Sequence, residues 1–517
     1  MSNRAQHLFD RAAESPQKIA VIFEGDEYTF TDLAQLVQKA AGGLKHLGIG
    51  KATRVGIMIP SSPQFIIAQQ ALFLLGAIVT PLSIFYRPAE VNHAIASCDL
   101  ECLLMTPELQ DRLAVDSTSP PNTLLSVIFF DEKVPVQQTR AQSLFNAISA
   151  SLPVEKLADI SADEVVMLLL TSATTGKSKG VMLTAANLAA NYDRTPSWLG
   201  LEPSARILCA LPLYNTFGLN QCINATLLTG ATMVLLPRFD AERCINAIDE
   251  YQCTFLPAVP TMLQKIIDHP SARDDRLSSL TKILTGGAPV PAALLRRVLA
   301  AAPRAEVLSA YGLTEGTALV TLTPVRLGED GEVEHGRTIG HVLDGITLAI
   351  IDDDGQLVGP GKVGEIVIRG PNVMRGYHHA PEDTAIALAG GWLHTGDIGY
   401  TDDEGFVFIV DRKKDVIIRG GQNIYPADIE EVIYQVAGVA EVGVVGIGDD
   451  MLGEVPIAFV SLLPGADVSI ATILDRCAEE LARYKIPAQI HLLKELPKGP
   501  TGKILRRELR VVAPNSR

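Results

Sequence analysis

Short apolar runs rich in β-branched residues alternate along the chain with segments whose apolar residues recur at helical spacing. The run RVGIMI at 54–59, followed by PQFIIAQQALFLLG, is typical of a strand that leads into a helix. The alternation favours β/α layers around a mainly parallel sheet, and hence an α/β fold. Further strands are predicted at 206–213, 232–237, 253–259, 282–287 and 305–312, with a helix from Ala292.

The pattern changes to hairpins after about residue 340, where ITLAIIDDDGQLV contains an Asp354–Gly355 turn. This part predicts a small β-rich layer. Past the charged stretch DRKKD, a helix, two strands, a helix and a strand predict an α+β unit of ordinary domain size. We therefore expect a large N-terminal domain at 1–411, a linker at 412–415 and a small C-terminal domain at 416–517.

Composition narrows the class of function. The net charge of −15 argues against nucleic acid as a partner, because polyanions are bound mainly by clustered Lys and Arg, and it favours a small-molecule substrate. The seven cysteines are odd in number and contain no C-x-x-C pair, which favours free thiols and a cytoplasmic location.

Two stretches bear on targeting and membranes. The N-terminus MSNRAQHLFDRAAESP lacks the apolar core of a signal peptide. The longest apolar stretch, 65–85, is interrupted by Gln69, Gln70 and Pro81. A buried helix that runs into a strand explains this stretch better than a transmembrane segment.

The first candidate for chemistry is the loop TSATTGKSKG at 171–180, which follows the apolar run EVVMLLL. Backbone N–H groups of a Gly/Ser/Thr turn, with a lysine beside them, form an anion site. One interpretation is a Walker loop with Thr171 in place of its first glycine, which would require a helix to start at Lys177. The apolar and β-branched residues of KSKGVMLT favour a hairpin-like turn instead. A P-loop phosphotransferase stays open as an alternative.

Four later stretches add candidate groups. SAYGLTE at 309–315 offers Tyr311 for stacking on a base and Thr314 with Glu315 as oxygen ligands for magnesium. GWLHTGDIG at 391–399 is expected to hold Asp397 in a Gly-flanked turn, where it can accept both hydroxyls of a ribose.

The last two stretches carry candidate cationic side chains. DRKKDVIIRGGQNIYP at 411–426 carries Arg412 at the predicted domain junction, and LPKGPTGKILRREL at 496–509 carries Lys503 in a Gly/Pro loop. In this order, the five stretches resemble the adenylate-forming superfamily of acyl-CoA synthetases, luciferases and adenylation domains, and most of all its acyl-CoA ligases. The resemblance spans nearly the whole chain.

The resemblance implies a two-step reaction that uses ATP, Mg²⁺ and coenzyme A. A carboxylate attacks the α-phosphate of ATP to give an acyl-adenylate and pyrophosphate, and a thiol then displaces AMP. It implies that Lys503 bridges the carboxylate and the α-phosphate, that Thr314 and Glu315 are catalytic, and that Glu315 holds the metal. Asp397 and Arg412 would bind the ribose.

The resemblance also implies sets of binding residues. Those of the phosphate loop are Thr171, Ser172, Ala173, Thr174, Thr175, Gly176 and Lys179. Those of the adenine slot are Gly287, Ala288, Ser309, Ala310, Tyr311 and Gly312. Those of the acyl pocket are Tyr214, Asn215, Phe217, Gly218 and Gly286.

A mobile C-terminal domain follows from the same resemblance. It would pivot at Lys414 between the two steps, removing Lys503 and bringing Gly420 and Gly421 to the tunnel for the pantetheine arm of coenzyme A. An acyl carrier protein in place of coenzyme A is an alternative acceptor, and a homodimer is an alternative to a monomer.

The chain departs from the family pattern at three positions that bear on activity. Ala173 stands where glycine is usual, Ser178 where proline is usual, and Asn215 where a histidine is common. A non-catalytic nucleotide-binding protein is therefore a further alternative. PLYNTFGL at 212–219 contains no carboxylate for an α-ammonium group, so a fatty or aryl acid is favoured over an amino acid.

Overall fold

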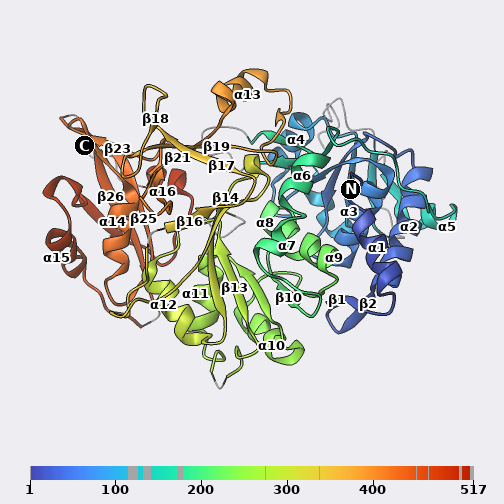
Figure 1. Ribbon diagram of the computed structural model, residues 1–517, viewed down its shortest axis with the longest axis horizontal. Coiled ribbons are helices and arrows are strands. Elements are labelled where there is room, and N and C mark those ends of the chain that lie inside the picture. Colours follow the sequence, from blue (N-terminus) through green and yellow to red (C-terminus); the bar gives the residue numbers. More distant parts are fainter. Residues whose placement is uncertain are drawn as a thin grey trace.

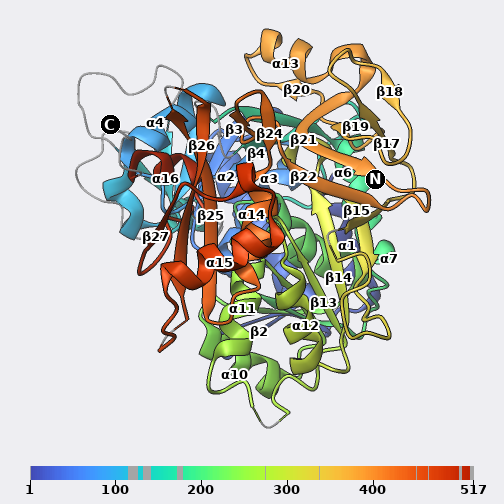
Figure 2. The same cartoon turned by 90° about the vertical axis from the view of Figure 1, so that its left-hand side faces the viewer.

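The computed structural model describes residues 2–113, 126–131, 141–171, 178–273, 275–336, 338–449, 451–463, 465–499 and 504–512. The described residues form three sheets. Figure 1 shows the N-terminal elements, in blue, at one end of the long axis and the C-terminal elements, in orange and red, at the other. Figure 2 is viewed from the C-terminal end.

The largest sheet has fourteen strands. Across the sheet they are β18 (Leu357–Val358), β17 (Thr347–Ile351), β19 (Gly364–Arg369), β21 (Leu393–Thr401), β22 (Val407–Arg412), β16 (Thr338–Val342), β15 (Leu319–Pro324), β14 (Glu306–Gly312), β13 (Lys282–Gly286), β12 (Phe255–Ala258), β10 (Arg206–Cys209), β11 (Thr232–Leu235), β1 (Ile19–Phe23) and β2 (Asp26–Thr29). From β14 to β1 every pairing is parallel. From β14 to β18 every pairing is antiparallel.

The second sheet has eight strands. In order they are β20 (Gly376–Tyr377), β9 (Gly180–Thr184), β8 (Val165–Leu170), β4 (Ile78–Pro81), β3 (Arg54–Met58), β5 (Cys102–Met105), β6 (Ser126–Phe129) and β7 (Ala141–Ser143). Strands β8 and β9 pair antiparallel on either side of the 171–179 loop, with Leu170 opposite Gly180. The expected hairpin is confirmed, and the Walker geometry is wrong, because a strand rather than a helix follows the loop.

The third sheet is C-terminal and has five strands. They are β24 (Gln422–Ile424), β23 (Ile417–Arg419), β26 (Gly453–Leu462), β25 (Val439–Asp449) and β27 (Gln489–Leu492). Two hydrophobic clusters belong to this sheet and its helices alone, one around Ile429 and Val444 and one around Phe459 and Leu509. This unit therefore has hydrophobic cores of its own.

Helices cover the faces of these sheets (Figures 1 and 2). In the N-terminal part they are α1 (Gln6–Glu14), α2 (Phe30–His46), α3 (Pro63–Leu75), α4 (Pro88–Ser97), α5 (Leu144–Ser149), α6 (Ala185–Asn191), α7 (Thr195–Trp198), α8 (Thr216–Gly218), α9 (Ala225–Thr229), α10 (Ala241–Tyr251), α11 (Pro260–Asp268), α12 (Ala292–Ala301) and α13 (Pro381–Ala387). In the C-terminal part they are α14 (Pro426–Tyr434), α15 (Ile470–Glu480) and α16 (Arg506–Val512).

The apolar stretch at 65–85 forms most of α3, which leads into β4. Pro63 stands in the first turn of the helix, and Gly76 ends it in a left-handed conformation with φ of 74°. The helix is buried on all sides, so the prediction of a buried helix that precedes a strand is confirmed. Across the described ranges, every helix is too short or too polar to span a bilayer.

Candidate active site

A cavity of about 1800 Å³ lies between the large sheet and the C-terminal unit. Fourteen residues singled out in the sequence lie on its wall: Thr171, Ser178, Tyr214, Asn215, Gly287, Ala288, Ser309, Ala310, Tyr311, Gly312, Thr314, Asp397, Arg412 and Lys414. They come from six separate stretches of the chain: 171–178, 214–215, 287–288, 309–314, 397 and 412–414. The fold thus brings the separate motifs to one cleft.

The nucleotide corner, which we define as Tyr311, Asp397 and Arg412, is built on three strands of the large sheet. Arg412 at the end of β22 is paired in register with Asp397 on β21, and its Nε lies 2.9 Å from Asp397 Oδ1. Tyr311 on β14 donates its hydroxyl proton to Asp397 Oδ2 at 2.6 Å. The carboxylate is 4% exposed and holds a partner on each oxygen. Each oxygen keeps a second lone pair for a ligand hydroxyl.

One expectation about this corner is wrong and one stays untested. Asp397 was expected in a turn, and this was wrong, because it lies within β21 directly after Gly396, whose φ is 70°. Burial, and then the charge of Asp397, raise the pKa of Tyr311 well above its usual value. The tyrosine is therefore a neutral hydrogen-bond donor, and stacking of its ring on a base stays a prediction.

Glu315 lies in a 3-10 turn, Thr314–Gly316, that follows β14. Its Oε1 accepts the hydroxyl proton of Tyr377 at 2.9 Å, and burial followed by this carboxylate raises the pKa of Tyr377. Among the described residues, Glu315 Oε2 has no hydrogen-bond partner. A half-buried carboxylate with one such oxygen fits the oxygen ligands that Mg²⁺ requires.

The residue that follows this turn is strained. Thr317 has a φ of 70°, although it is β-branched and fully buried. Its carbonyl accepts a hydrogen bond from Thr216 Oγ1 at 2.6 Å, and its hydroxyl donates to the Asn372 carbonyl at 2.5 Å. Strain of this kind persists where surrounding contacts hold it, which is common at functional sites.

Lys179 does not line the cleft. Its Nζ lies 2.6 Å from Asp383 Oδ1 on α13 and 5.2 Å from the centre of the Tyr377 ring. Tyr377 thus connects this lysine with Glu315. Of the other loop residues, Ser172, Ala173, Thr174, Thr175 and Gly176 lie outside the described residues.

At the expected acyl pocket, only Tyr214 and Asn215 line the cleft. Phe217, Gly218 and Gly286 do not, and the two glycines serve packing instead: an added Cβ would lie 2.2 Å from the Pro212 carbonyl oxygen at Gly218 and 2.3 Å from the Ala310 carbonyl oxygen at Gly286. Asn215 also caps α8, because its Oδ1 accepts from the Gly218 N–H at 3.0 Å.

The C-terminal unit contributes Lys498, Gly499 and Ile504 to the cleft wall. These residues flank Lys503, which itself lies outside the described residues. Gly420 and Gly421, expected near coenzyme A, are exposed in the β23–β24 hairpin and do not line the cleft. In this structure, therefore, the residues on both sides of Lys503 line the cleft, whereas Gly420 and Gly421 do not.

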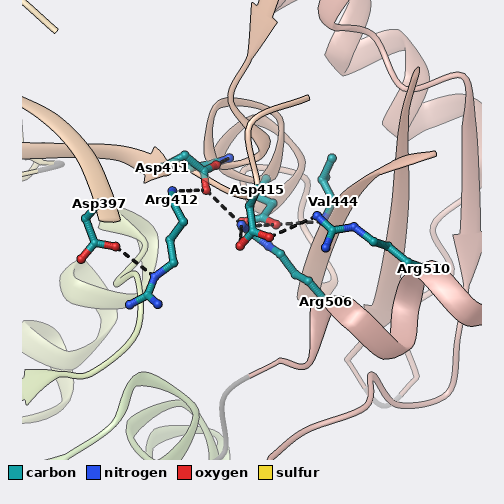
Figure 3. A network of polar contacts seen from close by, with 9 residues as sticks. Asp397, Asp411, Arg412, Asp415, Val444, Arg506 and Arg510 are labelled. Carbon is teal, nitrogen blue, oxygen red and sulfur yellow. Dashed lines mark hydrogen bonds and ion pairs between the residues drawn. The ribbon is translucent and has the colours of Figure 1, made fainter. Parts of the chain in front are cut away.

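The junction network, which we define as Asp411, Asp415, Glu430, Arg506 and Arg510, ties the C-terminal unit to β22 (Figure 3). Arg506 donates to both oxygens of Glu430, at 2.8 and 2.9 Å, to Asp411 at 3.0 Å and to Asp415 at 3.4 Å. Arg510 donates to Asp415 at 3.1 Å. The network spans the predicted linker on both sides.

Burial and neighbouring charges shift the pKa values of residues in and beside this network. Burial disfavours the charge on Arg506, but the three carboxylates around it raise its pKa, so the guanidinium stays charged. Burial raises the pKa of Glu430, and Arg506 opposes that shift. Lys414 lies beside the network, where desolvation and then the nearby arginines lower its pKa to about 8, against the opposing charge of Asp415.

Several of these residues carried no signal in the sequence. Tyr377, Asp383, Thr317 and Glu430 belong to no motif that was singled out, and Asp411 and Asp415 lie in the 411–426 stretch but had no role assigned to them. His394, in the stretch 391–399, lies 3.5 Å from Glu365 through its Nδ1.

Two family profiles match the chain: that of the AMP-binding enzymes over residues 8–378 and that of the AMP-binding enzyme C-terminal domain over residues 428–503. The chain is 32% identical to a long-chain-fatty-acid–CoA ligase of Bacillus subtilis, over 97% of this chain and 93% of that protein. It is 34% identical to a feruloyl-CoA synthase of an Amycolatopsis species, over 97% of each chain.

The similarity of the fold to solved structures agrees with the family match. The O-succinylbenzoate coenzyme A synthetase MenE of Bacillus subtilis, in complex with ATP and magnesium ion, superposes with a TM-score of 0.82. The two chains are 29% identical, with 98% of this chain and 99% of that chain covered. On the strength of the matching profiles and relatives, the chain belongs to the AMP-binding enzyme family and is an AMP-forming acid–CoA ligase that uses ATP, Mg²⁺ and coenzyme A.

Proposed function

We propose that this enzyme activates a fatty or aryl carboxylic acid and that the cleft described above carries both steps. In the first step a carboxylate oxygen bonds to the α-phosphorus of ATP, and the bond to pyrophosphate breaks. In the second step the sulfur of coenzyme A bonds to the acyl carbon, AMP leaves, and the thiol proton passes to solvent. The observation that carries the proposal is the nucleotide corner facing the flanks of the Lys503 loop across one cleft.

The nucleotide corner would hold ATP through its ribose. Asp397 is fixed on both oxygens before any ligand arrives, so binding requires little reordering of the site. Arg412 offsets the negative charge of the bound nucleotide. The adenine would lie along Gly287, Ala288, Ser309, Ala310, Tyr311 and Gly312, of which all six line the cleft.

Charge at the phosphates would be handled by Lys503, Lys179 and Glu315. Two anions must meet in the first step, so a cation has to lie between them, and we assign this role to Lys503. Lys179, with Thr171 and residues 172–176, would bind the leaving pyrophosphate after Lys179 gives up its contact with Asp383. Glu315, beside Thr314, would hold the Mg²⁺, which neutralises charge on the phosphate oxygens.

The acyl end of the cleft would start at Tyr214 and Asn215. The acids named for the relatives include long-chain fatty acids and the aryl acid of feruloyl-CoA. No carboxylate lies in residues 212–219 to receive an α-ammonium group, which supports these classes over amino acids.

Movement of the C-terminal unit would separate the two steps. We assign residues 1–411 to the N-terminal domain, 412–415 to the hinge with Lys414 as pivot, and 416–517 to the lid. The separate cores of the C-terminal unit support this division. The second arrangement would exchange the Lys503 loop for Gly420 and Gly421.

Three further assignments complete the proposal. Coenzyme A is the acceptor, with the phosphopantetheine arm of a carrier protein as the alternative. The enzyme acts in the cytoplasm, which the seven free cysteines support. A homodimer is the alternative to a monomer, and light scattering of the purified chain distinguishes the two.

Pyrophosphate exchange across a library of carboxylic acids tests the proposal. Exchange with fatty or aryl acids, followed by thioester formation from the adenylate with coenzyme A, is the expected result. ATP binding without exchange for any acid would identify a non-catalytic nucleotide-binding protein. Faster transfer to a holo carrier protein than to coenzyme A would overturn the acceptor assignment alone.

A further inference from the structure

Outside the cleft wall, Asp99, His378 and His379 bring three potential ligand atoms together. We propose that these three side chains form a zinc site, separate from the magnesium ligands at Glu315. Asp99 lies in the turn between α4 and β5, and the two histidines directly follow β20. The site would join two segments that are 280 residues apart in the sequence.

The geometry of the ligand atoms supports the proposal. A carboxylate oxygen of Asp99 and one ring nitrogen of each histidine all lie within 4.8 Å of one another. His378 Nε2 is 3.4 Å from Asp99 Oδ2, and His379 Nε2 contacts the same oxygen. Three donors from two loops thus converge on one point, as the ligands of a bound ion do.

The second observation is a buried nitrogen without a hydrogen bond. His378 Nε2 is shielded from solvent and forms no hydrogen bond of good geometry among the described residues, although Asp99 Oδ2, a member of the proposed site, lies 3.4 Å away. Buried ring nitrogens are normally satisfied, so this atom requires an explanation. A metal ion bound to Nε2 supplies one.

The backbone on both sides of the cluster is held in a costly conformation. Asp99 and His379 have φ values of 46° and 53°, in the left-handed region. Two hydrogen bonds hold these turns: Arg54 Nε donates to the Asp99 carbonyl at 2.8 Å, and the His378 N–H donates to the Gly180 carbonyl at 2.8 Å. Strained backbone that neighbouring contacts maintain is typical of ligand sites.

The donor set selects the kind of metal. Two imidazole nitrogens and one carboxylate oxygen suit zinc, whereas magnesium prefers oxygen donors alone. The side chain of His379 is 66% exposed, so an ion can enter from solvent and keep a water molecule as a fourth ligand.

Position relates the site to the enzyme's chemistry. His378 directly follows Tyr377, whose hydroxyl donates to Glu315. The backbone N–H of His378 donates to the carbonyl of Gly180, which directly follows Lys179. A bound ion would therefore clamp the α4–β5 turn to the β20–β9 pair beside the phosphate loop. The site would stabilise the frame of the active site without contacting a substrate.

Calorimetric titration of the chelator-treated full-length chain with Zn²⁺, in the absence of ATP, tests the proposal. The wild type is expected to bind one ion per chain, and saturating Zn²⁺ is expected to raise Tm by about 2 °C or more. Asp99→Asn and His379→Ala are each expected to weaken binding at least about tenfold and to remove the Tm shift.

His341→Ala is the matched control, because His341 is another exposed histidine, whose ring contacts Phe406. It should bind Zn²⁺ as the wild type does. Absence of zinc binding in the wild type, or wild-type binding by both Asp99→Asn and His379→Ala, would overturn the proposal. Pyrophosphate exchange without added Zn²⁺ reports whether each variant is folded, so a folding failure is distinguished from the loss of a ligand.

Discussion

The nucleotide corner and the junction network meet at neighbouring residues of β22, Arg412 and Asp411, yet they are built differently. The corner places three side chains on strands of one sheet, so the backbone fixes their positions. The junction network joins β22 to α14 and α16 through ion pairs. We propose that the corner stays constant through the reaction, whereas the junction is released when the C-terminal unit moves.

The largest expected effect is in the corner. Asp397→Ala removes the carboxylate and leaves Arg412 and Tyr311 without their partner, so we expect kcat/KM for ATP to fall about 100-fold or more. Both half-reactions should be affected, because the adenylate carries the same ribose. Asp403→Ala, an exposed carboxylate on the same hairpin, is the control, and an equal loss in that variant would refute a special role for Asp397.

A substitution in the junction network is expected to lower the stability of the protein. Arg506→Met leaves three carboxylates without their buried cation, which should lower the free energy of unfolding by about 3 to 5 kcal/mol. Denaturant unfolding of the full-length chain measures this effect. The exposed neighbour Arg507→Met should change stability by less than about 1 kcal/mol, and equal effects of the two changes would contradict the network's importance.

A substitution at Asn215 tests whether this residue only caps α8 or also determines which acids are accepted. Asn215→His removes the cap of α8, so a loss of about 1 kcal/mol in stability is expected. If Asn215 also shapes the acyl pocket, relative kcat/KM across a panel of acids changes as well. A lower Tm with an unchanged acid profile would leave Asn215 with the capping role only.

A smaller effect is expected at the phosphate loop. Asp383→Asn removes the partner of Lys179, and both side chains are more than a third exposed. Since exposed ion pairs contribute little, KM for ATP should fall by no more than about fivefold. An increase in KM would show that Asp383 orients the lysine rather than competes for it.

The smallest expected effect is at Lys414, the proposed pivot. Because the pKa of Lys414 is lowered to about 8, its amine loses its proton as pH rises through that value, well below the range of an ordinary lysine. At pH 8 about half of it should be neutral, against well under 1% for a lysine near 10.4. Mass spectrometry after amine labelling at pH 8 should find Lys414 modified faster than Lys413, which pairs with Glu365, and equal rates would contradict the lowered pKa.

Local patterns predicted most of the fold. Periodicity identified α3, the parallel strands from β10 to β14 and the hairpin at Asp354–Gly355, where Gly355 has φ of 75°. Strand ends were less accurate: β10 ends at Cys209, short of the predicted 213, ahead of Pro212. The continuity of the β-rich layer with the large sheet, through β15 and β16, depends on long-range pairing that periodicity does not contain.

The site, like the fold, has parts that local sequence patterns identify and parts that depend on long-range contacts. Asp397, Arg412 and Tyr311 lie in distinctive short stretches, so sequence alone located them. The contact between Tyr377 and Glu315 spans 62 residues, and that between Arg506 and Asp411 spans 95. Such pairs leave no local pattern, because a tyrosine or an aspartate on its own is common.

The most direct test of a constant corner and a releasable lid is the pair of half-reactions in Lys503→Ala. Adenylate formation, measured by pyrophosphate exchange, should be nearly abolished, while supplied acyl-adenylate should still be converted to the CoA thioester. Asp397→Ala, by contrast, should impair both. Equal loss of both half-reactions in Lys503→Ala would contradict the account.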